Sequence, residues 1–338
     1  MSVLAAVPKT NKVASVASEA IYVLNEGESR CLEGLLRNED PYNIILEEYF
    51  RNAELAFGSF PLALRYRIIE FRDCGNAEGF LLIRGMPRDP IVPPTPVKSE
   101  TYPMRATYYA EFLMACISRA LGQPVGYLQE KAGRIFQGIY PTSDHAYKQT
   151  SASSSVLLKF HTEVCFHRHL PDHLLLYGLR QDREALAKTI VSSIQRVLSH
   201  LTLDQRRRLS EPQFKTKVDL SYGGGEGPTI PILSGDPSQP HFRFDDDFME
   251  ASTPEGQRAL EALRNAVNAE KREIAIEPGD LIIIDNKMAV HARSEFQPHY
   301  DGSDRWLIRL LTVRDLCLSL GDRLPGTRVI ATDSFATL

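Results

Sequence analysis

Two histidines and a glutamate have the residue types and the spacing of a metal site. His161 and Glu163 are two residues apart in the largely apolar stretch VLLKFHTEVCFH, 156–167. Because residues i and i+2 of a strand point to the same face, we expect this imidazole and this carboxylate to reach one ion. His291 comes shortly after a buried-type strand expected at 281–284. Two histidines and one carboxylate leave positions open on Fe(II), so these three residues are the predicted metal ligands.

The composition is that of an ordinary globular protein with a sizeable core. The chain has 338 residues, 43% of them hydrophobic and 24% charged, with a net charge of −4 and a pI of about 6.2. We predict one domain, 1–338. The one basic run, Arg206 to Arg208, is interpreted as a solvated helix end, so nucleic acid is not an expected partner.

Cysteine usage and the N-terminal sequence predict a cytoplasmic protein. The five cysteines are odd in number, widely spaced and without a Cys-x-x-Cys pair, which is typical of reduced thiols. The first residues lack a basic segment followed by a sustained apolar core. No apolar run reaches the roughly 18 residues of a membrane span, so no membrane association is expected. The sequence leaves the oligomeric state open.

Apolar periodicity predicts helices mainly in the first third of the chain and strands mainly after it. The expected helices cover residues 14–36, 42–55, 62–74, 108–121, 182–201 and 254–269. The expected strands cover residues 79–85, 171–180, 213–222, 229–233, 241–245, 273–276, 281–284 and 307–313. The proline-rich segment 87–103 is predicted to be an extended surface loop, and the glycine-rich segment 223–227 a plain turn. These elements predict a β-sandwich decorated with helices.

Three motifs resemble the clavaminate synthase-like branch of the Fe(II)/2-oxoglutarate oxygenases, which includes hydroxylases of free arginine, asparagine and lysine. They are QTSASS at 149–154, FHTEVCFH at 160–167 and DGSDRWLIR at 301–309. The resemblance implies a mixed α and β fold with a double-stranded β-helix, or jelly-roll, core at 125–313. A mainly helical part, 1–124, would pack on that core. It also implies Fe(II), 2-oxoglutarate and O₂ as cofactor and co-substrates.

The resemblance assigns a co-substrate role to Arg305 and Thr189. Arg305 lies fourteen residues after His291, where the family places the arginine that binds the distal carboxylate of 2-oxoglutarate. A planar guanidinium can engage a carboxylate with two hydrogen bonds, which fits this role. Thr189 resembles the hydroxyl that assists. The alternatives are a surface ion pair for Arg305 and a structural threonine for Thr189.

Four further residues are candidates for binding the head of an amino acid, and two of them, Arg309 and Ser151, resemble contacts in the family. Arg309 is on the same predicted strand face as Arg305, where relatives bind the substrate carboxylate. Ser151, ten residues before His161, would meet polar groups of the substrate. Glu130 and Gln129 are candidates for the α-ammonium group, on spacing alone.

Asp245 and Asp247 are the candidates for the far end of the substrate. Their i, i+2 spacing lets both carboxylates clamp one guanidinium, as an Asp-x-Asp pair does in arginine hydroxylases. When the family's spacing is counted back from His291 without gaps, Arg243 and not Asp245 falls at the first position of the Asp-x-Asp pair. Lysine and asparagine therefore stay open as substrates. A solvated acidic turn is the alternative.

The predicted activity is hydroxylation of C3 or C4 of a free L-amino acid with a basic side chain, with release of succinate and CO₂. Arginine or an arginine derivative is preferred over lysine, and residues 137–154 are expected to close over the substrate as a lid. A zinc hydrolase is an alternative, although the helical His-Glu-x-x-His is missing and Arg305 is left unexplained. A non-redox metal-binding protein on the same jelly-roll is another, because one fold hosts many functions. The neighbouring His167, His169 and His173 are not expected to bind metal.

Overall fold

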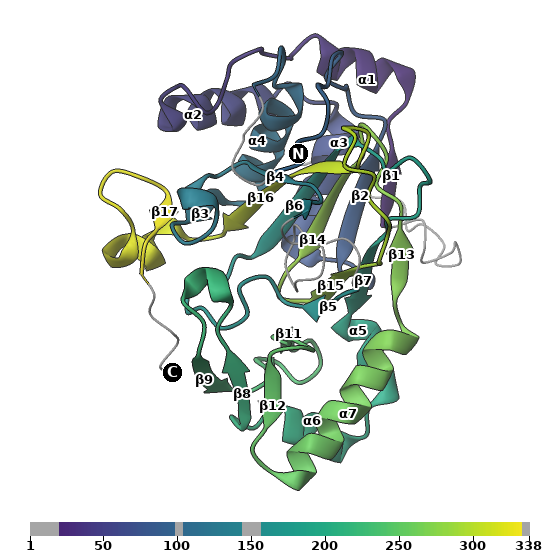
Figure 1. The fold of residues 1–338 in the computed structure, drawn as a ribbon, viewed down its shortest axis with the longest axis vertical. Helices are drawn as coiled ribbons and strands as arrows, with labels where there is room; N and C mark the ends of the chain where they lie inside the picture. The colour runs from purple at the N-terminus through teal and green to yellow at the C-terminus, as the bar shows by residue number, and fades with distance from the viewer. Residues whose placement is uncertain (1–19, 99–103, 144–156, 333–338) are drawn as a thin grey trace, which may run out of the picture.

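Two β-sheets pack face to face in the computed structural model, which describes residues 20–98, 104–143 and 157–332 (Figure 1). The eight-stranded main sheet has the order β1-β2-β14-β6-β16-β3-β17, with β4 paired to β16. Its strands are β1 Ile21–Val23, β2 Phe80–Arg84, β14 Leu281–Asp285, β6 His173–Arg180, β16 Trp306–Val313, β3 Gln123–Tyr127, β17 Val329–Ile330 and β4 Gln137–Ile139. The second sheet has the order β13-β7-β15-β5: Arg272–Ile274, Thr189–Ser193, Ala289–Arg293 and Leu158–His161. This is the predicted jelly-roll.

Alternation along β16 decides which residues face the second sheet. Leu307 and Leu311 pack in the core between the sheets, whereas Ile308 and Leu310 pack on the opposite face. Arg309 therefore points between the sheets, because side chains alternate along a strand. With both faces covered, all eight residues of β16 are buried.

Four helices cover the outer face of the main sheet (Figure 1). They are α1 Glu26–Glu33, α2 Leu46–Phe57, α3 Leu62–Cys74 and α4 Tyr109–Leu121. Phe112 and Leu113 of α4 share a core with Ile308 and Leu310 of β16. Figure 1 shows that the N-terminal part is more than a helical layer, because its strand β2 lies inside the main sheet between β1 and β14.

The second sheet is covered by helices and short strands on its outer face. The helices are α5 Ile194–Val197, α6 Leu203–Leu209 and α7 Pro254–Ala269; the strands are β8 Phe214–Lys217, β9 Glu226–Ile230, β10 Leu233–Ser234, β11 His241–Phe242 and β12 Met249–Ala251. Val290 and Ala292 of β15 pack with Leu260 and Leu263 of α7. The intervening residue, His291, consequently faces the space between the sheets. None of the helices in the described ranges is long and apolar enough to cross a bilayer.

Two of the predicted helices are wrong. Within the helix expected at 14–36, the structure has β1 at Ile21–Val23 and then α1 at Glu26–Glu33. The helix begins after Asn25 because Asn25 is its N-cap and forms a reciprocal capping box with Glu28. Residues 14–19 lie outside the described ranges. The helix expected at 182–201 is instead β7 followed by α5. The run Thr189-Ile-Val is β-branched and pairs with β13 and β15, so tertiary pairing overrides its helix-like apolar spacing.

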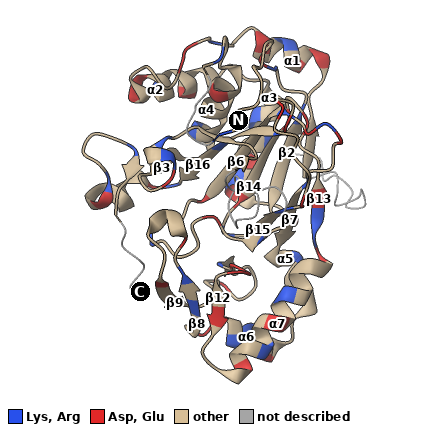
Figure 2. Cartoon of the chain, in the orientation of Figure 1, with Lys and Arg blue, Asp and Glu red and all other residues tan. Residues whose placement is uncertain are grey.

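Two smaller predictions are confirmed. Arg206 to Arg208 occupy the last turn of α6, a helix outside the ranges expected above (Figure 2, Lys and Arg in blue). Gly223, Gly224 and Gly225 all have positive φ and form the turn before β9, so this segment is no phosphate loop.

Candidate active site

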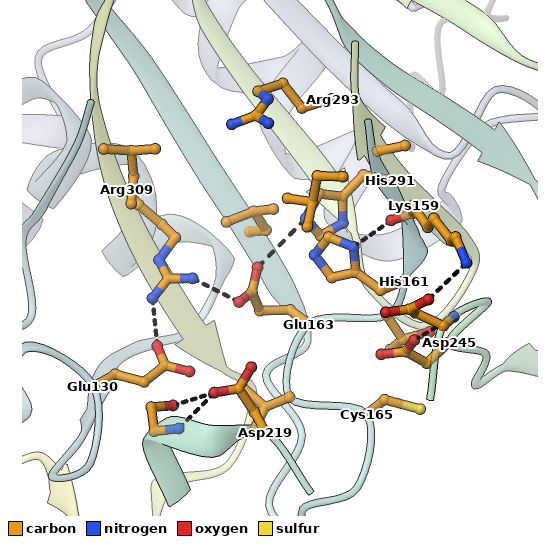
Figure 3. Close-up of a pocket in the computed structure, with 18 of the residues that line it drawn as sticks. Glu130, Lys159, His161, Glu163, Cys165, Asp219, Asp245, His291, Arg293 and Arg309 are labelled. Atoms are coloured by element: carbon orange, nitrogen blue, oxygen red, sulfur yellow. Dashed lines mark hydrogen bonds and ion pairs between the residues drawn. The ribbon is translucent and has the colours of Figure 1, made fainter. Parts of the chain in front are cut away.

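The three predicted metal ligands come together between the sheets. β15 pairs antiparallel with β5 so that His291 lies directly opposite His161, with ring centroids 4.2 Å apart. One ligand atom from each of His161, Glu163 and His291 lies within 4.8 Å of the other two, and His291 Nε2 is 3.4 Å from Glu163 Oε2. Within the described ranges no other group of histidine, cysteine and acidic residues has this arrangement. Figure 3 shows all three side chains pointing into one pocket.

The structure corrects two local expectations about this triad. Glu163 is not on a strand, because β5 ends at His161 and the next residues form a turn in which Val164 has positive φ. His291 follows β14, as expected, but it lies at the centre of a further strand, β15, which the sequence analysis did not predict. The convergence therefore depends on cross-strand pairing and a turn rather than on one strand face.

Asn286 fixes the position of Glu163. The sequence analysis did not identify this residue. Its Oδ1 accepts the backbone N–H of Glu163 at 2.8 Å, and its Nδ2 donates to the Glu163 carbonyl at 3.2 Å and to the Pro171 carbonyl at 2.9 Å. Asn286 is fully buried in the turn that joins β14 to β15. The turn that leads to His291 therefore also holds the third ligand.

The donor set fits Fe(II). The Nδ1 atom of His161 is 2.8 Å from the Lys159 carbonyl, so a proton on Nδ1 is bonded there and Nε2 is left to bind a metal. Burial lowers the pKa of His291 to about 4, with help from the neighbouring His161, so its imidazole is neutral at pH 7. Burial alone would raise the pKa of Glu163, but Arg309 and the two histidines hold it well below its usual range. A neutral imidazole at His291 and an ionised carboxylate at Glu163 are the forms that bind Fe(II).

Arg305 and Thr189 are also brought together, at one end of the pocket. Arg305 Nη2 donates to Thr189 Oγ1 at 2.9 Å, and both residues are buried. Arg305 is thus no surface ion pair, and burial lowers its pKa to about 10. Arg293, which the sequence analysis did not single out, also lines this pocket. Burial and the nearby Arg305 lower the pKa of Arg293 to about 9. Two guanidinium groups therefore line this part of the pocket.

Arg309 links the triad to Glu130. Its Nη1 donates to Glu163 Oε1 at 2.6 Å, and its Nη2 donates to Glu130 (Figure 3). Gln137 accepts from Arg309 Nε at 3.2 Å, and Tyr222 donates its hydroxyl to Glu130 at 3.1 Å. Gln137 belongs to β4, so the first residues of the expected lid are part of the main sheet.

Asp245 and Asp247 line the same pocket, and Figure 3 shows Asp245 on the side opposite Glu130. Asp245 forms an isolated β-bridge with His161, and its Oδ1 accepts the backbone N–H groups of Asp247 and Phe248 at 3.0 and 2.9 Å. Asp247 accepts a hydrogen bond from Lys159 Nζ at 2.6 Å. Arg243 is directed elsewhere, toward the carbonyls of Cys165 and His167. Asp245, and not Arg243, is therefore the pocket residue.

A cavity of about 460 Å³ contains nearly all the predicted site residues. Its walls include His161, Glu163, His291, Arg305, Thr189, Arg309, Asp245, Asp247, Glu130 and Gln129. The walls also include Lys131, Lys159, Asp219, Tyr222 and Arg293, which the sequence analysis missed because nothing in their spacing relates them to the triad. Ser151 and residues 144–154 of the expected lid lie outside the described ranges. His167, His169 and His173 do not line this cavity.

Comparison with known proteins agrees with this geometry. The family described as taurine catabolism dioxygenase TauD, TfdA family matches residues 69–311. The chain belongs to this family. It is a 2-oxoglutarate-dependent amino acid hydroxylase that uses Fe(II) and O₂, which confirms the predicted enzyme class and cofactors. The zinc-hydrolase and non-redox alternatives are not supported.

Three relatives of the oxygenase show what similar chains act on or bind. It is 34% identical to an L-lysine 3-hydroxylase of Catenulispora acidiphila over 322 residues, 92% of this chain and 89% of the relative. A solved structure of asparagine oxygenase with Fe(II), 2S,3S-3-hydroxyasparagine and succinate has a TM-score of 0.86 and 30% identity, covering 93% and 99% of the two chains. The non-heme iron oxygenase OrfP with Fe, succinate and (3S)-hydroxy-L-Arg has a TM-score of 0.82 and 27% identity, covering 92% and 99%.

Proposed function

We propose that this oxygenase hydroxylates C3 or C4 of a free L-amino acid with a basic side chain, arginine or a close derivative before lysine. One observation carries the proposal: a single cavity holds the metal triad between the Arg309–Glu130 pair and the Asp245–Asp247 pair (Figure 3). The Arg309–Glu130 pair matches the α-carboxylate and α-ammonium of an amino acid, and the acidic pair matches a positively charged side chain.

The co-substrate is assigned to the Arg305 end of the cavity. Bound Fe(II), with 2-oxoglutarate and O₂, supplies the oxidation that places oxygen on an unactivated C–H bond. His161, Glu163 and His291 would hold the iron, and the buried Arg305 guanidinium with the Thr189 hydroxyl would bind the distal carboxylate of 2-oxoglutarate. A guanidinium fits a carboxylate with two parallel hydrogen bonds, which orients as well as binds it.

The head of the amino acid is assigned to Arg309 and Glu130. In the unliganded protein these two side chains pair with each other. An α-amino acid carries a carboxylate and an ammonium on adjacent atoms, so it can replace this pairing by placing its carboxylate on Arg309 and its ammonium on Glu130. Gln129 and Ser151 are further proposed contacts to the polar head.

The side chain would then run past the triad toward Asp245 and Asp247. With both ends held by charged groups, a methylene in the middle of the substrate is placed near the metal, and positioning selects C3 or C4. Two carboxylates suit the several N–H donors of a guanidinium. The known relatives that act on lysine or bind hydroxylated arginine support a basic side chain.

A substrate screen tests the proposal. The protein is incubated with Fe(II), 2-oxoglutarate, O₂ and each of the twenty L-amino acids, and succinate and product mass are measured. Arginine or lysine should stimulate succinate release and gain about 16 Da, one oxygen atom. Stimulation by asparagine alone would contradict the basic side chain. Stimulation only by an amide-linked or tethered amino acid would contradict the free substrate and the assignment of Arg309.

A further inference from the structure

Lys159 places a cation of the protein itself at the acidic end of the cavity. It lies on β5 two residues before His161 and therefore points to the same side of the strand. Its Nζ atom is 2.6 Å from Asp247 Oδ1, and both residues line the cavity (Figure 3 labels Lys159). The Lys159 side chain is 44% exposed and that of Asp247 is 29% exposed, so the pair is accessible from the pocket.

The Lys159–Asp247 ion pair limits the hydrogen-bond acceptors that Asp245 and Asp247 leave for a substrate. Asp245 Oδ1 already accepts two backbone N–H groups, and Asp247 Oδ1 already accepts the ammonium of Lys159. A basic side chain that reaches Asp247 must therefore displace Lys159 or lie close to it. Two cations at one carboxylate repel each other, which weakens binding.

A substrate with a carboxamide side chain can bind to the Lys159–Asp247 pair without breaking it. The Lys159–Asp247 pair presents N–H donors on one side and a carboxylate acceptor on the other. A carboxamide has one acceptor oxygen and one donor NH₂ group, so it can bond to both partners without separating them. A guanidinium or an ammonium has donors only and can use Asp247 but not Lys159.

We propose that Lys159 determines side-chain specificity by competing with basic substrates for Asp247 while tolerating, or directly binding, an amide side chain. This inference rests on the proposed amino acid pocket. It goes beyond that proposal because it assigns substrate discrimination to Lys159, which is neither a predicted metal ligand nor a proposed contact to 2-oxoglutarate or to the head of the amino acid. Removing the ammonium should shift the preference toward arginine and lysine.

The variant Lys159→Met tests the role of the charge. It keeps a side chain of similar length and the backbone carbonyl that bonds to His161 Nδ1. The ratio of kcat/KM for L-arginine or L-lysine to kcat/KM for L-asparagine should rise roughly 10-fold, a modest figure because the pair is partly exposed. The change should appear in the KM for the amino acid. Lys159→Arg retains the positive charge and should keep the ratio near that of the parent.

Lys215→Met is the matched control. Lys215 forms an ion pair with Glu226 at the same 2.6 Å, and its side chain is also 44% exposed, but it does not line the cavity. Its removal should leave the substrate ratio unchanged. A ratio that stays constant or falls in Lys159→Met, or that rises equally in Lys215→Met, overturns the inference.

A binding measurement separates this inference from the proposed function. L-arginine, L-lysine and L-asparagine are titrated calorimetrically into the Mn(II)–2-oxoglutarate complexes of the parent and of Lys159→Met. If the amino acids bind but none is oxidised, the proposed activity fails, while the affinity ratio still decides the role of Lys159. If the amino acids are oxidised and the affinity ratio does not change, the specificity role fails alone. If none binds either protein, both fail.

Discussion

Asn286 holds the backbone of Glu163 on both sides, accepting from its N–H at 2.8 Å and donating to its carbonyl at 3.2 Å. This contact places a metal ligand that lies in a turn, where no strand pairing would hold it. The same asparagine starts the turn into the strand of His291. Asn286 is therefore a positioning residue that couples two ligands.

Replacing Asn286 with alanine should weaken iron binding and the fold together. The substitution leaves buried backbone groups without partners, which costs about 1–3 kcal/mol of unfolding free energy, and loss of such support typically reduces metal affinity 10- to 100-fold. Urea denaturation and Fe(II) titration measure the two effects. Asn286→Asp, which keeps the acceptor for the Glu163 N–H, should bind iron better than the alanine variant. Equal metal affinity in the parent and Asn286→Ala would contradict this role.

Replacing Glu163 with alanine should abolish turnover, because two histidines alone do not complete the facial triad. The variant should also lose the visible charge-transfer band that we expect when the parent binds Fe(II) and 2-oxoglutarate without O₂. Circular dichroism serves as the control for folding. Undiminished succinate production would rule out Glu163 as a ligand.

Arg305→Ala should raise the KM for 2-oxoglutarate roughly 100-fold, as expected when one partner of a buried charged pair is lost. Iron affinity should change far less, since Arg305 contacts Thr189 and not the triad. Arg305→Lys should restore only part of the affinity, because an ammonium lacks the two-pronged geometry of a guanidinium. If Arg305→Lys titrates with 2-oxoglutarate like the parent, the bidentate role is incorrect.

Arg309→Met should impair both amino acid binding and the iron site, because Arg309 contacts Glu163 as well as Glu130. Glu130→Gln should raise the KM for the amino acid with a smaller effect on iron affinity, since Glu130 is not a metal ligand. Steady-state kinetics with varied amino acid and a separate Fe(II) titration distinguish the two variants. Equal iron affinity in Arg309→Met and the parent would show that the Glu163 contact has no role in metal binding.

His173 should make the fold sensitive to mild acid. Burial lowers the pKa of His173 below its usual value, and the ring is neutral in the core beside Thr312. In the unfolded chain the pKa is about 6.5, so below that pH the unfolded state binds more protons and is favoured. Stability should therefore fall by up to about 1 kcal/mol between pH 6.5 and 5.5 from this group, because the unfolded histidine goes from half to almost fully protonated over this range. Urea denaturation of His173→Gln at both pH values should show a smaller loss than the parent; an identical loss contradicts the assignment.

Several features of the fold and site follow from local patterns in the sequence. The runs at 79–85, 281–284 and 307–313 are short and mostly apolar, which predicts strands, and the structure places all three in the main sheet. The spacing of His161, Glu163 and His291 indicated a metal site. The roles of Arg305 and Arg309 came from a family resemblance and not from periodicity.

Other features of the fold and the site depend on pairing between residues that are far apart in the sequence. The helix-like spacing at 182–201 gave no sign that Thr189 begins a strand, because only pairing with β13 and β15 selects that conformation. Nothing local relates Asn286 to Glu163, 123 residues away, or Lys159 to Asp247, 88 residues away. These contacts form because the register of β5 against β15 and the turns at the strand ends bring distant polar side chains into one cavity, where burial makes each of them need a partner.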